Sequence, residues 1–393
     1  MHKLILNPGR EKSLLRRHPL IFSGALARCE GRPESGETVA IHAADGRFLA
    51  WAAYSPASQI IARTWSFDPQ EQIGADFFRA RVRHAVSSRA ALVAKEAAQR
   101  LINGESDGVP GLIVDRYNDV AVLQANSAGA ARWRDAIADA LVEDGGVRAV
   151  YERSDSDVLA LEGLEPRTGW LRGTGDTRLE VVENGLRFIV DIARGHKTGF
   201  YIDQRENRIL IGRLANGREM LNAFCYTGGF TIHALAHGAT RVVSVDTSAD
   251  ALSTGRESAS LNDLPAQRAE WVEADVFEFL RRLRDQGRQV DVIVLDPPKF
   301  APTPASAERA ARGYKDINLL AFKLLRPGGL LATFSCSGGI SRELFQKIVA
   351  SAAADAAVDA NILRRFEAGP DHPVSLHFPQ GDYLKGLLCQ RHG

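Results

Sequence analysis

The stretch EMLNAFCYTGGFTIHALAHGATRVVSVD, from Glu219 to Asp246, decides the fold of the carboxyl-terminal half of this chain. It reads as an apolar strand, a glycine turn at Gly228, a helix and a second apolar strand. From about Arg205 onward, strands and helices keep alternating, which predicts a parallel sheet with helices on both faces. The glycine turn lets a ligand approach the helix N-terminus, so it is a candidate nucleotide site. It lacks G-x-G-x-x-G, which disfavours a dinucleotide.

The acids that end the second and third strands are candidate ligand contacts. Asp246 stands where a carboxylate can accept hydrogen bonds from both ribose hydroxyls, and an N-cap for the next helix is the alternative. We favour ribose binding because the glycine loop and the acid occur together. The third strand ends in Asp275 and Val276, where an acid and its neighbouring amide could face an adenine edge. The residues alone do not decide for or against that contact.

Two further strand ends carry reactive groups. The sequence DPPKF (Asp296–Phe300) follows the fourth strand, and its two prolines stiffen the edge of the sheet where α/β active sites lie. Loop rigidity is the alternative, but Asp296 and Lys299 would place two charges in the ligand crevice. Cys336 follows the fifth strand. A cysteine often fills an apolar core, whereas this one stands on a turn among small residues, so we favour a reactive thiol.

The first 190 residues predict two further domains. Residues 1–75 contain short strands separated by turn residues, which predicts a small β-barrel. A helical linker from about Asp76 to Leu101 leads to a β-β-α-β-β segment, whose last strand runs from Leu179 to Asp191. The predicted fold class is therefore α/β, with domains at 1–75, 76–191 and 192–393. The expected barrel strands are Leu20–Ser23, Thr38–His42, Phe48–Tyr54 and Ile60–Trp65.

The composition describes an ordinary folded protein with an uneven distribution of charge. Apolar residues make up 45% of the 393 residues and charged ones 25%, which excludes a disordered, collagenous or coiled-coil chain. The net charge of +1 combines an excess of six positive charges in residues 1–100, an excess of seven negative charges in residues 101–190 and an excess of two positive charges in residues 191–393. This segregation favours contact between the basic part and a polyanion. The candidate polyanion-binding residues of this part are Arg10, Lys12, Arg16 and Arg17.

Cysteine and histidine spacing give no support for a metal or a disulfide scaffold. The four cysteines lie far apart without a C-x-x-C pair. His233 and His237 are spaced i, i+4, but no third ligand accompanies them, so we predict no metal. No apolar run approaches the roughly 18 residues needed to span a bilayer. We therefore expect a soluble, cytoplasmic protein without a membrane partner.

Several motifs together resemble those of the bacterial large-ribosomal-subunit RNA cytosine-C5 methyltransferases of the RlmI type. Their order and spacing make the resemblance specific over about 190 residues, while the middle segment matches in shape only. The motifs are TGFYIDQRENR (Thr198–Arg208), NAFCYTGGF (Asn222–Phe230), SVDTS (Ser244–Ser248), VLDPPKF (Val294–Phe300), RGYKDIN (Arg312–Asn318), TFSCSGG (Thr333–Gly339) and DHPV…GDYLKG (Asp371–Gly386).

The resemblance implies a Rossmann-like class I methyltransferase domain, an N-terminal PUA barrel that binds 23S rRNA, and an α+β middle domain. It implies S-adenosylmethionine as the cofactor and Cys336 as the nucleophile. The implied cofactor contacts are Asn222, Phe224, Cys225, Tyr226, Thr227, Gly228, Asp246, Asp275, Val276 and Asp296.

The implied chemistry suits these residue types. Cytosine C5 is a poor nucleophile, so a thiolate must add to C6 before C5 can attack a methyl group. Asp296 is the first candidate for the proton transfers and Asp371 or His372 a weaker one, and the base stays unassigned. Lys299 would lower the pKa of the thiol or neutralise a phosphate.

One feature departs from many RNA cytosine-C5 methyltransferases. Those enzymes carry a second cysteine in the loop that here contains Lys299 and Phe300, where it assists product release. Cys225 belongs to the cofactor loop, and packing is its expected role.

Three other functions stay open. The nearest is methylation of an rRNA guanine by direct attack. That reaction needs no nucleophile from the enzyme, so a covalent adduct at Cys336 would exclude it. A nicotinamide-dependent dehydrogenase lacks the expected glycine fingerprint. A non-catalytic RNA-binding protein would leave Asp246, Asp296 and Cys336 at successive strand ends unexplained. The sequence gives neither the modified nucleotide nor the oligomeric state, and a homodimer stays open.

Overall fold

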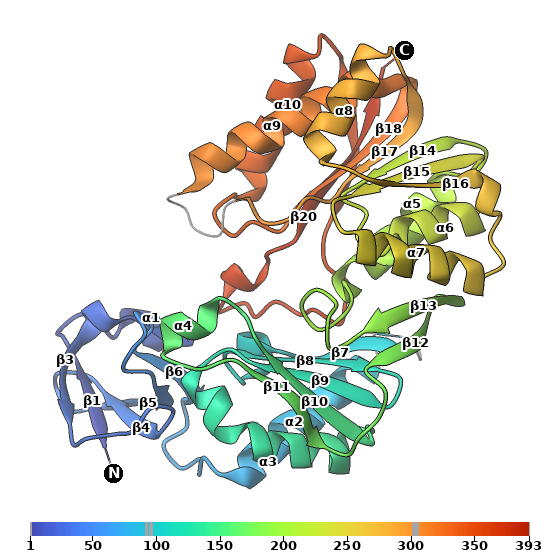
Figure 1. Ribbon diagram of the computed structural model, residues 1–393. Helices are drawn as coiled ribbons and strands as arrows, with labels where there is room; N and C mark the ends of the chain where they lie inside the picture. The colour runs from blue at the N-terminus through green and yellow to red at the C-terminus, as the bar shows by residue number, and fades with distance from the viewer. Residues whose placement is uncertain (1, 91–92, 94–96, 301–305, 393) are drawn as a thin grey trace. The chain divides into compact units, whose positions relative to one another are not determined.

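The computed structural model describes residues 2–90, 93, 97–300 and 306–392 (Figure 1). The chain forms two compact units, each assembled from separate parts of the sequence. The first unit consists of Met1–Val181, Val190–Ile202 and Pro370–Gly381. The second unit consists of Val182–Ile189, Asp203–Gly369 and Asp382–Gly393.

The first unit begins with a small six-stranded β-barrel. Its strand order is β2-β6-β5-β4-β1-β3, and alternate residues such as Val39 and Ile41 point into its core. The strands β1 and β3 were not predicted because each is short and lacks a clear alternating pattern. The elements are β1 (Lys3–Leu6), α1 (Lys12–Leu15), β2 (Leu20–Ile21), η1 (Ser23–Ala25), β3 (Leu26–Glu30), β4 (Thr38–His42), β5 (Phe48–Tyr54) and β6 (Ala62–Ser66).

The rest of the first unit contains a five-stranded sheet of order β11-β10-β9-β8-β7. The elements are α2 (Ala75–Ala90), β7 (Ala98–Asn103), η2 (Gly104–Asp107), β8 (Leu112–Tyr117), β9 (Val120–Ala125), α3 (Ala128–Asp144), β10 (Ala149–Ser154), α4 (Val158–Glu162) and β11 (Arg167–Arg172). Aromatic and aliphatic side chains of α2 and α3 share one core with β7, β8 and β9.

Two predictions about this middle segment were wrong in detail. The helix predicted to reach Leu101 ends at Ala90, and β7 pairs antiparallel with β8, where the Arg100 guanidinium binds the Asp115 carboxylate. The single strand predicted from Leu179 to Asp191 is a hairpin of β12 (Arg178–Glu183) and β13 (Leu186–Asp191). Asn184 and Gly185 form its turn with φ of 52° and 79°, as a type I′ turn requires.

The second unit contains a seven-stranded sheet of order β16-β15-β14-β17-β18-β20-β19. The first five strands are parallel, and β20 is antiparallel to both of its neighbours. The chain moves outward from β14 to β16 and then returns to β17 on the other side of β14. Ligands bind at such a reversal, outside the carboxyl ends of the strands. The strands are β14 (Glu219–Ala223), β15 (Arg241–Asp246), β16 (Ala269–Glu273), β17 (Val290–Leu295), β18 (Leu325–Ser335), β19 (Ala360–Phe366) and β20 (Lys385–Arg391).

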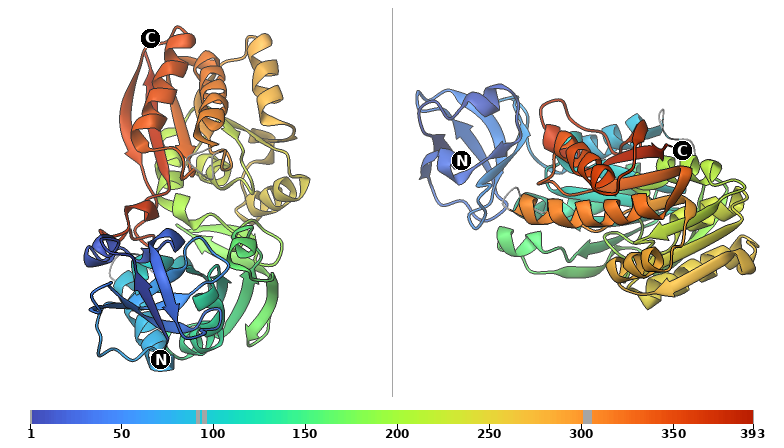
Figure 2. Two further views of the ribbon diagram at one scale, coloured as in Figure 1. Left: turned by 90° about the vertical axis from the view of Figure 1, so that its left-hand side faces the viewer. Right: turned by 90° about the horizontal axis from the view of Figure 1, so that it is seen from above.

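Helices cover both faces of this sheet (Figures 1 and 2). Successive residues of β17 alternate between the faces: Val292 and Val294 pack with α5 and α6, whereas Ile293 and Leu295 pack with α8, α9 and α10. The predicted α/β class with helices on both faces is confirmed. The helical elements of this part of the chain are η3 (Ile202–Gln204), α5 (Arg205–Leu214), α6 (Gly229–Ala236), α7 (Ala249–Leu261), η4 (Ala266–Arg268), α8 (Val276–Asp285), α9 (Ala307–Leu324) and α10 (Arg342–Asp355). A further short helix, η6 (Pro379–Gly381), belongs to the first unit.

Candidate active site

The carboxyl ends of the parallel strands bring most of the sequence-predicted site residues to one edge. Along the strand order β16, β15, β14, β17 and β18, this edge carries Asp275, Asp246, the loop 224–228, Asp296 and Cys336. Asp296 and Cys336 follow the ends of β17 and β18, which are neighbours in the sheet. Neighbouring strands lie about 4.8 Å apart. Asp246 and the loop lie on the other side of Asp296. The edge therefore has a carboxylate-rich half and a thiol-bearing half.

The loop after β14 holds an unusual backbone conformation. Phe224, Tyr226 and Gly228 have φ of 60°, 49° and 73°, a left-handed region that non-glycine residues rarely adopt. The Tyr226 amide donates to the Asp246 carboxylate at 2.8 Å, and the Gly228 amide donates to the Cys225 carbonyl at 2.8 Å. A β-carbon at Gly228 would lie 2.4 Å from the Trp271 ring. Such backbone strain persists where surrounding contacts enforce it, and it is common in ligand-binding loops.

Asp246 ties this loop to the end of β15. One carboxylate oxygen accepts from the Tyr226 amide and the other from the Ser248 amide at 3.0 Å. The N-cap of α7 is Ser248, whose hydroxyl accepts from the Ala251 amide, so Asp246 does not serve as that cap. Each carboxylate oxygen has a second lone pair, and the side chain is only partly buried. Asp246 can therefore accept further hydrogen bonds from a ribose.

Asp275 and Val276 begin helix α8. The exposed Asp275 is the N-cap, and its carboxylate accepts from the Glu278 amide at 3.0 Å. Val276 is buried in the core shared by α8 and the sheet. Capping of α8 therefore explains the position of Asp275. Its carboxylate is exposed to solvent after the end of β16, which pairs with β15, the strand that ends in Asp246.

Three polar or sulfur-bearing residues of the loop region are buried. Asn222 is fully buried and donates from its amide to the Thr231 hydroxyl at 2.9 Å, so it anchors the first turn of α6. Thr227 is buried, and its hydroxyl has no hydrogen-bond partner among the described residues. Burial and then the Asp246 charge raise the pKa of Cys225 well above its ordinary value. This environment favours a neutral, packing thiol at Cys225.

Asp296 is held by a buried chain of amides. The Gln204 side chain, 2% exposed, donates to the Asp296 carboxylate at 3.1 Å. Asn207 donates in turn to the Gln204 side-chain oxygen at 2.6 Å. Lys299 is exposed at the same loop. The sequence analysis did not assign a role to Gln204, although it lies within the motif TGFYIDQRENR.

Cys336 stands on a turn shaped by buried hydroxyl groups. Its side chain is partly exposed, whereas Ser335, Ser337 and Tyr314 are buried. The Ser335 hydroxyl donates to the Tyr314 hydroxyl at 2.9 Å, which lies 2.9 Å from the Ser337 hydroxyl. Lys385 Nζ donates to the Ser337 carbonyl at 2.8 Å. Tyr314 and Lys385 were missed as site residues, although both lie in the quoted motifs.

The remaining candidates belong to the first unit. Asp371 is fully buried, and its carboxylate accepts from the Arg100 backbone amide and binds His372 Nδ1, each at 3.1 Å. The four basic residues of the amino-terminal patch are all exposed, and the Arg17 guanidinium lies over the Phe67 ring at 5.5 Å. The patch consists of Arg10, Lys12, Arg16 and Arg17.

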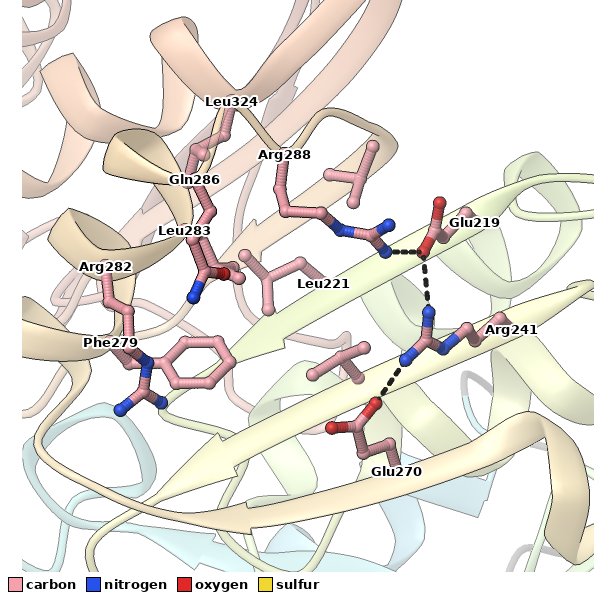
Figure 3. A pocket seen from close by; sticks show the side chains of 12 residues that line it. Glu219, Leu221, Arg241, Glu270, Phe279, Arg282, Leu283, Gln286, Arg288 and Leu324 are labelled. Carbon is pink, nitrogen blue, oxygen red and sulfur yellow. Dashed lines mark hydrogen bonds and ion pairs between the residues drawn. The ribbon is translucent and has the colours of Figure 1, made fainter.

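A pocket of about 320 Å³ lies at the opposite, amino-terminal ends of the strands (Figure 3). Four of its charged side chains pair with one another: Glu219 binds Arg288 at 2.9 Å and Arg241 at 3.5 Å, and Arg241 also binds Glu270 at 2.5 Å. Because this pocket lies away from the strand ends that carry Asp246 and Cys336, it is not the candidate active site.

The described residues include neither a membrane-spanning helix nor a cluster of metal ligands. No helix among them is long and apolar enough to cross a membrane. Within the same residues, no group of three or more His, Cys, Asp or Glu side chains could hold a metal ion.

The carboxylate-rich half of the edge suits S-adenosylmethionine. This cofactor offers a ribose diol as donor and two cationic groups, a sulfonium and an ammonium. Asp246 can accept hydrogen bonds from the diol, and the Asp296 carboxylate can attract a cationic group. The loop 224–228, which β15 holds in its strained form, presents backbone groups between these two acids.

The family models agree with this geometry. Residues 162–388 match the S-adenosylmethionine-dependent methyltransferase family, and residues 4–67 match the PUA-like domain. The fold and the site therefore define an S-adenosylmethionine-dependent methyltransferase that carries an amino-terminal PUA-like domain.

Relatives that match over almost the whole chain identify the family more narrowly than the domain models do. The chain is 49% identical to the ribosomal RNA large subunit methyltransferase I of Shewanella amazonensis, with 99% of each chain covered. It is 50% identical to the protein of the same name from Aeromonas hydrophila, with 98% of each covered. The chain belongs to this family, ribosomal RNA large subunit methyltransferase I. A putative methyltransferase crystallised with SAH shares the fold, with a TM-score of 0.87, 23% identity, and 99% and 100% of the two chains covered.

Proposed function

We propose that this enzyme uses S-adenosylmethionine to methylate cytosine C5 in 23S rRNA, with Cys336 as the nucleophile. The observation that carries the proposal is the order of groups along one sheet edge. Cys336 and Asp296 follow adjacent strand ends, and Asp246 with the strained loop lies on the far side of Asp296. A nucleophile for the base, a proton-transferring carboxylate and a cofactor contact thus follow one another.

The protein groups act in a fixed sequence. The Cys336 thiolate adds to C6 of the cytosine, and the electron pair displaced from the C5–C6 bond is taken up as N3 gains a proton from an acid, for which Asp296 is the candidate. When bound, S-adenosylmethionine would supply an electrophilic methyl group for C5, with S-adenosylhomocysteine as the leaving group. A base then removes the C5 proton and N3 returns its proton to the acid, so that the Cys336 thiolate is expelled and the aromatic ring is restored.

RNA binding is assigned to the first unit. The relatives named as ribosomal RNA methyltransferases and the PUA-like match support an rRNA substrate. Arg10, Lys12 and Arg16 are exposed on the barrel, where they can contact phosphates. We propose three functional regions: an RNA-binding barrel at 1–75, a middle domain at 76–191 and a methyltransferase domain at 192–393.

An RNA that carries 5-fluorocytidine at the target position tests this chemistry. Fluorine leaves no C5 proton to remove, so elimination stalls and the enzyme stays bonded to the methylated RNA. A denaturant-resistant complex is expected with wild-type protein and none with Cys336→Ala, while S-adenosylmethionine binding persists in the variant.

The matched control is Cys225→Ala. A complex that survives in Cys336→Ala and disappears in Cys225→Ala would overturn the assignment of the nucleophile. Methylation of the natural RNA without any trapped complex would favour direct attack by a guanine nitrogen. Mass spectrometric mapping of methylated nucleotides in 23S rRNA from cells with and without the protein would then identify the product.

A further inference from the structure

Lys385 is a buried lysine beneath the turn that carries Cys336. Only 4% of its surface is exposed. It is the first residue of β20 and pairs across the antiparallel ladder with Ser335, the residue before Cys336. Its ammonium donates to the carbonyl of Ser337, the residue after Cys336, at 2.8 Å. The two residues that flank Cys336 are thus both tied to Lys385.

The charged groups around Lys385 leave Cys336 as its main partner. Burial lowers the pKa of Lys385, and the strongest charge that opposes this effect is the Cys336 thiolate, followed by Asp382. Asp382 already binds the Arg342 guanidinium through both oxygens, at 2.6 and 2.7 Å. Arg342 and Lys299 are cations and act on Lys385 in the opposite direction. A thiolate at Cys336 would therefore offset the charge of this buried ammonium.

The hydroxyl groups at the turn add no competing charge. Burial raises the pKa of Tyr314, so its hydroxyl stays neutral near physiological pH. It fixes Ser335 and Ser337 by hydrogen bonds on the side of α9. Lys299 is also near, but it is exposed, and water screens a solvated charge much more than a buried one.

We propose that Lys385 is a positioning residue for the nucleophile: its ammonium fixes the 335–337 turn and stabilises Cys336 as a thiolate. The thiol proton leaves to solvent, and the ammonium keeps its own. This inference rests on the proposed role of Cys336, and it replaces Lys299 as the cation that activates the thiol. Lys299 then stays available to contact an RNA phosphate.

The pH dependence of alkylation tests this proposal without RNA or cofactor. Full-length protein is treated with iodoacetamide across a pH series, and the modification of each cysteine is followed by peptide mass spectrometry. Because only the thiolate reacts, the inflection of the rate profile gives the thiol pKa. For Cys336 in wild-type protein we expect it below the ordinary value of about 8.5.

Three variants separate charge from geometry. Lys385→Gln keeps a hydrogen-bond donor for the Ser337 carbonyl but loses the charge, so the Cys336 inflection should rise by about one pH unit or more. Lys385→Arg keeps the charge and should preserve most of the low inflection. Lys299→Gln is the matched control and should change it little. The Cys29 profile, on the barrel, should be the same in all four proteins.

Several outcomes would overturn the proposal. A wild-type Cys336 inflection at or above 8.5 would do so regardless of how the variants fold. An unchanged inflection in Lys385→Gln, or a shift in Lys299→Gln alone, would also refute it. Failure of the proposed function is distinguishable: a low inflection that depends on Lys385, without a trapped 5-fluorocytidine complex, would leave this inference standing and remove the C5 chemistry.

Discussion

The Gln204 side-chain amide donates a hydrogen bond to the Asp296 carboxylate, with Nε2 and Oδ2 3.1 Å apart. Gln204 itself is oriented by Asn207, which binds its side-chain oxygen. The acid at the centre of the proposed site is therefore placed by residues that precede β14, the first strand of the seven-stranded sheet in the sequence. This arrangement gives the first prediction.

Replacing Gln204 with leucine should slow methyl transfer while leaving the fold intact. The variant removes the donor to Asp296, so the acid loses its orientation, and a reduction in kcat of about 10- to 100-fold is expected. Gln204→Glu is the companion variant, because a second carboxylate would raise the pKa of Asp296. Single-turnover assays at several pH values check both. Equal rates in wild type and Gln204→Leu would show that Asp296 needs no such support.

Replacing Asp246 with alanine should weaken S-adenosylmethionine binding by about 1.5–3 kcal/mol, since charge-assisted hydrogen bonds to the ribose are lost. The loop amide of Tyr226 also loses its acceptor, which adds to the effect. Isothermal titration measures the affinity. Asp275→Ala is the comparison variant. Because Asp275 caps α8, this variant should lose about 1 kcal/mol of folding stability. A larger loss of cofactor affinity in Asp275→Ala than in Asp246→Ala would show that Asp275, and not Asp246, is the main cofactor contact.

Removing three exposed basic residues from the barrel should weaken RNA binding and leave cofactor affinity unchanged. In the triple variant Arg10→Ala, Lys12→Ala, Arg16→Ala, each lost phosphate contact should reduce the salt dependence of log Kd by about one. Arg17 is kept because it lies over Phe67. Arg28→Ala is the matched control, since the Arg28 guanidinium already pairs with Glu30 at 2.8 Å. Filter binding to a 23S rRNA fragment at several salt concentrations measures the slopes.

Acid should destabilise the second unit through Glu183. Burial would raise the pKa of this carboxyl, but the Arg208 charge and the His233 hydrogen bond outweigh burial and lower it from 4.5 to about 2. Because the folded-state pKa is the lower one, the resulting stability is present above about pH 4.5 and is lost as pH falls towards 2. The difference corresponds to about 3 kcal/mol.

Urea unfolding between pH 2 and 7 tests this expectation. Glu183→Gln should be less stable at pH 7, since it leaves the buried Arg208 without its partner, and its stability should change less between pH 4.5 and 2. Glu165→Gln, at an exposed position, is the control and should follow the wild-type curve. Parallel curves for Glu183→Gln and wild type would show that the titrating group lies elsewhere.

The sequence predicted best those features that depend on short-range pattern. The strands that end at Asp246, Asp296 and Cys336 were recognised because buried parallel strands form apolar runs followed by turn residues. The hairpin at Asn184 was missed, although the Asn-Gly pair was visible, because apolar residues recur on both sides of that pair, as they would along one long strand.

Features that depend on tertiary pairing were not predictable in the same way. The strand β7 contains the adjacent apolar residues Leu101 and Ile102, which fit a helix or a strand equally well, and its pairing with β8 decides between them. Gln204 and Lys385 carry no chemical signature in the sequence. Their importance follows from burial beside Asp296 and Cys336, which only the fold provides. The cofactor and RNA contacts assigned from the sequence stay predictions.

The segment Pro370–Gly381 has a consequence for biosynthesis. It belongs to the first unit, although it lies between β19 and β20 of the second unit. Asp371 accepts from the Arg100 amide across 271 residues of sequence, and Asn103 donates to the Pro373 carbonyl across 270. At roughly 5–20 residues per second, a ribosome needs about 15–50 s to travel from one partner to the other. During that interval the nascent first unit lacks the segment Pro370–Gly381, so it can mature only after that segment has been synthesised.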